Sequence, residues 1–332
     1  MKRIFKWGVA IALGLVPPAF AHQHTDDARF KEMVSLFGTA DVVGEPSIVP
    51  CKLSGGEETK CLRITTIAAP TNHDTGPFCP RTVSSTADES GTWVKDGELY
   101  DVDGKFIENL ATFYDDDEWQ MFDPKTGKVT LVEGRLGCEV AGDPTSADRY
   151  KNTCVECDVE FMGDEDVTQT YFIPLKPTKF LWRGAKIGKE SGVGLALNGV
   201  KFDAPAPLHL ILGGHTLGPF DDCVGHGNPH GGYHYHGVAG CEEQADASIP
   251  EHAPIIGVSM DGYNIHTRTD RNGEEPDDLD RCRGHDVKGL GYHYHANSAG
   301  SNQIIGCFAS QVGCVSSDPN GKCDATVKRK RR

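Results

Sequence analysis

The tetrad Tyr-His-Tyr-His occurs twice in this chain, at residues 233–236 and 292–295. Each copy ends the same longer frame, Asp-x-Cys-x-Gly-His-x6-Tyr-His-Tyr-His, which begins at Asp221 in the first copy and at Asp280 in the second. A second pair of matching segments, at 193–202 and 256–265, lies upstream of the two frames. Internal similarity at a spacing of about 60 residues indicates a duplicated structural unit. We therefore predict a β-rich C-terminal domain made of two copies with a pseudo-twofold relation.

The alternation of tyrosine and histidine in each tetrad predicts a strand with two different faces. Successive side chains of a strand point to opposite faces, so the two histidines of a tetrad lie about 6.6 Å apart on one face. Both tyrosines share the other face, where we expect them to pack. A His-x-His strand is therefore a two-pronged clamp for a metal ion.

Neutral imidazole suits zinc and copper, which take three or four nitrogen or sulfur ligands. The histidine that follows glycine in each frame is a candidate third ligand, and the upstream aspartates are candidate acceptors that fix the histidine tautomer. The alternative is structural, with hydrogen-bonded histidines on a tyrosine-packed strand. The predicted ligands are His226, His234, His236, His285, His293 and His295, with Asp221, Asp261 and Asp280 behind them.

Several short stretches resemble the YHYH domain family. These are Asn-Gly-Val-x-Phe-Asp at 198–203, Asp-Asp-Cys-x-Gly-His at 221–226, Pro-Ile-Ile-Gly at 254–257 and Asp-Gly-Tyr at 261–263, together with both tetrads. The resemblance covers about residues 193–307 and implies an exported domain without a defined reaction.

The amino terminus is typical of a secretory signal peptide. Lys2, Arg3 and Lys6 precede a short apolar stretch, and Ala19-Phe20-Ala21 is a small-x-small cleavage site, so we expect residues 1–21 to be removed. The mature protein is then predicted to be exported, periplasmic or extracellular. Cleavage would leave His22-Gln23-His24 at the new terminus, where the free amine and the histidines form a candidate copper site. The alternative is adventitious copper binding at an exposed end.

Twelve cysteines in an exported chain predict up to six disulfides. The repeat favours pairing Cys223 with Cys241 and Cys282 with Cys307, which links the start of each frame to the segment after its tetrad. Weaker expectations are Cys51–Cys61 and Cys314–Cys323. For Cys154 and Cys157 we favour bridges to Cys79 and Cys138 over a redox or zinc site.

The formal charge of −15 disfavours binding to nucleic acid or anionic lipid and favours cations. The acidic run at 274–280 is interpreted as a solvated loop, because the ligand spacing of a calcium loop is missing. No segment is long and apolar enough to predict stable membrane insertion.

The remaining length predicts a separate N-terminal domain, giving a mainly β, disulfide-linked protein of two domains. A short helix is expected from Thr25 or Asp26, followed by strands at 61–67, 105–114, 128–133 and 168–175. The predicted organisation is a signal peptide at 1–21, an N-terminal domain at 22–180, a duplicated domain at 186–315 and a basic tail at 316–332.

These features predict an exported protein that holds copper or zinc in His-x-His clamps, with a role in metal handling. One alternative is a metal-dependent hydrolase or lyase acting on an envelope or extracellular polymer, in which the metal activates water. The other is a metal-free structural or adhesive module. Signatures of serine nucleophiles, phosphate loops and dinucleotide binding are missing from the sequence.

Overall fold

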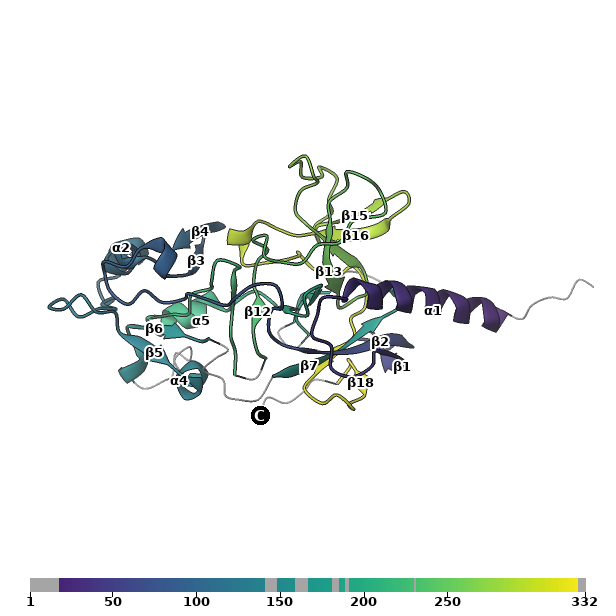
Figure 1. The fold of residues 1–332 in the computed structure, drawn as a ribbon, viewed down its shortest axis with the longest axis horizontal. Coiled ribbons are helices and arrows are strands. Elements are labelled where there is room, and N and C mark those ends of the chain that lie inside the picture. Colours follow the sequence, from purple (N-terminus) through teal and green to yellow (C-terminus); the bar gives the residue numbers. More distant parts are fainter. Residues whose placement is uncertain are drawn as a thin grey trace, which may run out of the picture.

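The computed structural model describes residues 18–140, 148–158, 167–180, 185–188, 191–229 and 231–327. This part of the chain is mainly β, as predicted, with strands in four sheets and a few short helices beside one long helix (Figure 1). The helices are α1 Pro18–Leu36, α2 Gly104–Glu108, α3 Leu110–Tyr114, α4 Arg135–Val140 and α5 Leu208–Gly213, with 3₁₀ turns at Ala87–Glu89, Asp148–Tyr150 and Ala299–Ser301.

The largest sheet has eight strands in the order β11-β12-β9-β8-β13-β14-β16-β15. Its pairings recur in the two halves. In the first half β8 forms an antiparallel hairpin with β9, β9 pairs in parallel with the tetrad strand β12, and β12 pairs with the antiparallel edge strand β11. In the second half β13, β14, β16 and β15 follow the same order. The antiparallel pair β8–β13 joins the halves. The strands are β8 Gly194–Ala196, β9 Lys201–Phe202, β11 Gly225–His226, β12 His234–Tyr235, β13 Ile255–Ser259, β14 Asn264–His266, β15 Gly284–Val287 and β16 Gly291–His295.

The hairpin turns of this sheet explain the Asn-Gly and Asp-Gly dipeptides of the repeat. Gly199 and Gly262 both have positive φ, 87° and 90°, a conformation that glycine adopts without steric cost. At Gly262 a Cβ atom would also lie 2.4 Å from the carbonyl oxygen of Pro174, so the neighbouring sheet packs directly on this turn.

A five-stranded sheet, ordered β17-β7-β2-β1-β18, packs beside the repeat and combines both ends of the chain. The predicted strand at 61–67 lies within β2, and the one at 168–175 is β7. The end of the chain contributes β17 and β18, and β18 pairs in parallel with β1. The strands are β1 Ser47–Lys52, β2 Glu58–Ile67, β7 Thr168–Pro174, β17 Cys314–Ser316 and β18 Cys323–Asp324.

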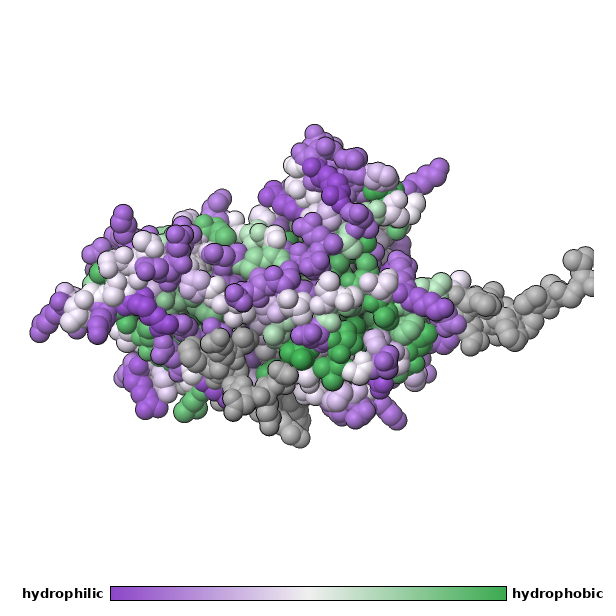
Figure 2. Space-filling model, in the orientation of Figure 1, coloured by the Kyte–Doolittle hydropathy of each residue, from purple (hydrophilic) through white to green (hydrophobic). Residues whose placement is uncertain are grey.

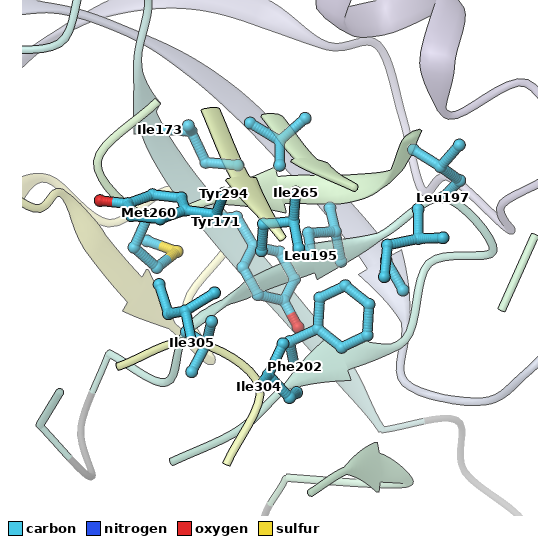
Figure 3. Packing of buried hydrophobic residues seen from close by; sticks show 14 of the residues in the cluster. Tyr171, Ile173, Leu195, Leu197, Phe202, Met260, Ile265, Tyr294, Ile304 and Ile305 are labelled. Atoms are coloured by element: carbon cyan, nitrogen blue, oxygen red, sulfur yellow. The ribbon is translucent and has the colours of Figure 1, made fainter. Parts of the chain in front are cut away.

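The main core lies between these two sheets and helix α1 (Figure 3). Met33 from α1 and Tyr171 from β7 are fully buried in the same cluster as Leu195, Tyr235 and Tyr294 from the repeat. Residues on both sides of position 180 therefore share one core, and the division into domains there stays a prediction.

Helix α1 begins earlier than the sequence predicted. Asp26 does not cap it but lies inside it, where its carboxylate pairs with Lys60 at 3.1 Å and Lys176 at 3.4 Å. Residues 1–17 of the predicted signal peptide and residues 328–332 of the basic tail fall outside the described part. No helix in that part is long and apolar enough to cross a membrane.

A second core, centred on Trp93 and Phe220, is built around the remaining strands and short helices. The strand predicted at 105–114 is wrong, because this segment forms α2 and α3. The carboxylate of Asp103 accepts a 2.7 Å hydrogen bond from the Phe106 amide and begins α2, and the apolar residues recur at helical spacing. Of the strand predicted at 128–133, only Leu131–Glu133 forms a strand, β5. The strands here are β3 Thr92–Lys95, β4 Glu98–Asp101, β5 Leu131–Glu133, β6 Thr153–Glu156 and β10 Thr216–Leu217.

All twelve cysteines are paired, which confirms every pairing expected from the sequence. Both repeat disulfides join the start of the frame to the segment beyond the tetrad. The six bridges are Cys51–Cys61, Cys79–Cys154, Cys138–Cys157, Cys223–Cys241, Cys282–Cys307 and Cys314–Cys323.

Candidate metal centres

The tetrad strands separate tyrosines from histidines. Tyr233, Tyr235 and Tyr294 are fully buried in the main core. The histidines face away from it, and in each copy an edge strand brings in a third one. Strand pairing sets His226 opposite His234 and His285 opposite His293, so three of the predicted ligands meet in each copy.

In the second copy, the Nε2 atom of His285 lies 3.0 Å from Nε2 of His293 and 3.1 Å from Nε2 of His295. In each of the three rings Nδ1 contacts an oxygen that can only accept. These acceptors are the Asp278 carboxylate for His285 at 2.6 Å, the Gly291 carbonyl for His293 at 2.9 Å and the Thr267 carbonyl for His295 at 2.9 Å.

This arrangement fixes the tautomers and leaves the inner nitrogens without donors. Since each Nδ1 carries the proton, Nε2 of each neutral ring presents a lone pair. The lone pair of His285 faces those of His293 and His295 at 3.0 and 3.1 Å, and such lone pairs repel one another unless a cation lies between them. In a tetrahedral site with metal–nitrogen bonds of about 2.0–2.1 Å, neighbouring nitrogens are about 3.3 Å apart, so the spacing fits zinc or copper.

The first copy repeats this pattern with His226, His234 and His236. Nδ1 of His234 donates to the Gly232 carbonyl at 3.1 Å, and Nδ1 of His236 donates to the Ala204 carbonyl at 2.8 Å. The three ring centroids are 4.8 to 5.1 Å apart, and one potential ligand atom from each ring lies within 4.8 Å of the others. The first copy therefore also holds a three-histidine centre. We call it the first centre, and we call the group of His285, His293 and His295 in the second copy the second centre.

Burial favours the neutral form of five histidines of the two centres, His226, His234, His236, His293 and His295, by lowering their pKa values. It lowers the pKa of His236 to about 3, that of His293 to about 4 and that of His295 to about 3. Burial and the neighbouring histidines hold the pKa of His226 well below its usual range. Unprotonated nitrogens are the form that binds metal, and they are present here throughout the neutral range.

The second centre has a fourth histidine that the sequence analysis missed. The ring of His252 lies 4.9 Å from that of His293 and 5.3 Å from that of His295, and a ring nitrogen lies within 4.8 Å of the other potential ligand atoms. In the alignment of the two copies, position 252 corresponds to Lys189, so the repeat gave no signal for it.

The predicted aspartates are near the tetrads but contact the tyrosines. Asp221, Asp280 and Asp261 accept hydrogen bonds from the hydroxyls of Tyr233, Tyr292 and Tyr294, at 2.7, 2.9 and 2.7 Å. The upstream aspartates therefore face the tyrosine side of the strand, and backbone carbonyls and Asp278 orient the histidines instead. The acidic run at 274–280 was predicted to be only a solvated loop, but its Asp278 accepts from His285 and its Asp280 accepts from Tyr292.

The two centres are separate, because four strands of the sheet lie between β12 and β16. A third grouping, His73 with Cys223 and Cys241, offers no thiolate, since these cysteines are bonded to each other. The remaining predicted ligands, His22 and His24, fall within the first turns of α1, and their side chains are outside the described part.

The family model described as YHYH protein matches residues 170–277. The chain contains a YHYH domain. The match begins in β7 and ends before the second tetrad, whereas the resemblance seen in the sequence spans about 193–307. No curated protein and no solved structure matches the chain.

The second centre opens into a cleft of about 760 Å³. His252, His285 and His295 line it together with five acidic residues, and among the described residues that line it none is lysine or arginine. Figure 2 shows the projection that carries β15 and β16 as largely hydrophilic. The acidic lining residues are Glu251, Asp270, Glu274, Glu275 and Asp277.

Replacing Asp278 with alanine is expected to weaken zinc binding at the second centre by about 10–100-fold, because the carboxylate fixes the tautomer and raises the basicity of His285. Titration of the metal-free variant with zinc, followed by calorimetry, measures this loss. The first centre serves as the internal control and should keep its affinity. Unchanged affinity at both centres would show that Asp278 does not support a ligand.

Behind the first centre, on the tyrosine side, lies a polar cluster of the YHYH domain. The Tyr235 hydroxyl lies 2.7 Å from Nε2 of His73 and accepts a 2.9 Å hydrogen bond from Asn198. Nδ1 of His73 lies 2.8 Å from the Asp74 carbonyl, so it carries the proton and Tyr235 donates to Nε2. The cluster ties the loop around residue 73 to β12.

Glu242, beside this cluster, is expected to make stability depend on pH. It is 4% exposed, and burial raises its pKa to about 7, above the unfolded value of 4.5. A raised carboxyl pKa means that the folded state binds more protons between these values, so stability is lost as the pH rises toward 7 and above. Glutamine does not ionise in this range, so the Glu242→Gln variant should not show this loss of about 3 kcal/mol in the free energy of unfolding.

The measurement is urea unfolding at pH 5 and pH 8.5 with the disulfides intact. Relative to the wild type, the free energy of unfolding of Glu242→Gln should be higher at pH 8.5 than at pH 5. Glu58→Gln, at an exposed site, should differ from the wild type by the same amount at both pH values. Equal differences at the two pH values for Glu242→Gln would contradict the expected direction.

Proposed function

We propose that this exported protein binds copper or zinc at the two histidine centres of its YHYH domain and takes part in metal handling. The observation that carries the proposal is the set of inner Nε2 atoms of the second centre. Nε2 of His285 lies 3.0 Å from that of His293 and 3.1 Å from that of His295, and all three are acceptors, because each Nδ1 donates outward. Such a set is stable around a cation and repulsive without one.

The duplication supports the same conclusion. Two sites built from matching strand pairs repeat the same three histidine positions, and the recurring pairings support a pseudo-twofold relation about β8 and β13. A structural role for the histidines does not require that lone pairs converge in both copies. The amino-terminal His22 and His24 would add a copper site after signal cleavage.

Six disulfides support an oxidising location, which fits a periplasmic or extracellular protein that meets metal ions outside the cytoplasm. In that setting the sulfur of the cysteines is committed to bridges, so imidazole nitrogens and carboxylate oxygens are the ligands that remain for zinc.

A hydrolase is the second candidate, favoured by the size of the cleft, which is in the range of small-molecule sites. In a catalytic zinc site, three protein ligands leave a position for water. His252 argues against it, because it offers a fourth histidine nitrogen within 4.8 Å of the other potential ligand atoms. Metal handling therefore fits the four-histidine group better.

Thermal unfolding with and without metal tests the proposal. A ligand that binds only the folded state stabilises it by about 2.7 kcal/mol at 100 times its dissociation constant. Zinc or copper should raise the unfolding midpoint of the chelator-treated protein, and magnesium should not. A midpoint that neither zinc nor copper changes would refute metal binding.

A further inference from the structure

The two centres differ in their access to solvent. In the first centre His234 and His236 are each 5% exposed, and the ring of Phe220 lies 4.9 Å from that of His226 and 5.3 Å from that of His236. Phe220 therefore packs against two rings of this centre, of which His226 is partly exposed. We expect an ion held there to leave more slowly than one beside an open cleft.

The second centre lies at the base of the cleft. His293 and His295 are themselves buried, at 2% and 1% exposed, but His295 contributes to the cleft wall together with His285 and His252. A buried imidazole with an acceptor nitrogen therefore borders open space. His252 comes from the loop that forms one wall, not from the sheet that fixes the other three ligands.

The cleft carries a negative field. Its five acidic side chains stand near one another without a basic lining residue, although Arg268 and Arg283 pair with Glu275 at its edge. Clefts lined by one sign of charge concentrate ions of the opposite sign and can raise association rates by about 10–1,000-fold.

We propose that the second centre exchanges divalent cations with solvent through this acidic cleft, whereas the first centre retains its ion. This inference rests on the proposed metal binding and assigns different tasks to the two copies. Glu251, Glu274 and Asp277 draw the hydrated cation in, and the strand histidines replace its water. His252 then completes the coordination shell from the cleft wall and leaves it again during release.

The test is a two-step exchange experiment on the full mature protein. Zinc-loaded protein is mixed with excess chromogenic chelator, and release is followed in time. We expect two phases of one equivalent each, with rates at least about 10-fold apart. The fast phase should be missing from His293→Ala/His295→Ala and retained in His234→Ala/His236→Ala.

Zinc uptake by the metal-free protein tests the charge. Glu251→Gln/Glu274→Gln/Asp277→Asn should slow the fast uptake about 10-fold at low salt and flatten its salt dependence. Asp88→Asn/Glu89→Gln/Asp115→Asn, a change of equal charge in the second-core region, should leave uptake unchanged.

The outcomes separate the two claims. Release of both equivalents at one rate, a fast phase that belongs to the first centre, or uptake that ignores the cleft charges would overturn the exchange proposal while metal binding stands. A protein that takes up no zinc at all would instead refute the proposed function.

Discussion

A His293→Ala/His295→Ala variant is expected to bind one equivalent of zinc where the unaltered protein binds two. The change removes two of the three histidine nitrogens that lie around His285. The affinity of the second centre for zinc should fall by more than about 100-fold, since loss of a residue that only orients a ligand already costs about 10–100-fold. The remaining equivalent belongs to the first centre. Elemental analysis of the exported protein, purified without a histidine tag, measures the stoichiometry.

The reciprocal variant, His234→Ala/His236→Ala, should also bind one equivalent, and combining both changes should leave none. His209→Ala, at an exposed histidine outside both centres, is the matched control and should bind two. Because a variant that fails to fold would also lose metal, each is compared by its thermal unfolding with the disulfides intact. Two equivalents in both double variants would refute the assignment of the ligands.

Removing the Cys282–Cys307 disulfide by Cys282→Ser/Cys307→Ser is expected to destabilise the protein by about 3–4 kcal/mol, the chain-entropy estimate for a loop of this length. The bridge lies two residues before β15, whose His285 pairs with His293. Its loss should loosen this edge strand and lower the zinc content at the second centre more than at the first. Urea unfolding and metal analysis measure the two effects.

The control is Cys314→Ser/Cys323→Ser, which opens a bridge in the five-stranded sheet. That variant should lose stability, by somewhat less because its loop is shorter, and should keep both zinc ions. Equal loss of zinc in the two variants would show that the repeat disulfide does not position the second centre.

Much of the candidate site was predictable because strand periodicity is local. Tyr-His-Tyr-His specifies which side chains share a face, whatever the rest of the fold does, and the shared frame predicted that His226 and His285 join the tetrads. The pairs Cys223–Cys241 and Cys282–Cys307 followed from the same repeat. The partners of Asp221 and Asp280 were not predictable, because their contacts depend on how the edge strand crosses the tyrosine face.

His252 and the cleft could not be predicted from the sequence for a different reason. The position aligned with His252 in the first copy is Lys189, and the approach of His252 to β16 is a tertiary contact between residues about forty positions apart. Likewise, the apolar residues at 105–114 suit a strand or a helix, and the Asp103 cap together with packing in the second core decides for the helix.

Two metal ions are expected to lie between the histidines of the repeat. A crystal structure of zinc-loaded protein, with anomalous data collected at the zinc edge, tests this directly. We predict two anomalous peaks, each about 2.0–2.1 Å from three histidine Nε2 atoms, with His252 as the fourth ligand at the second centre. Peaks confined to surface carboxylates, or no peak beside His285 and His226, would contradict it.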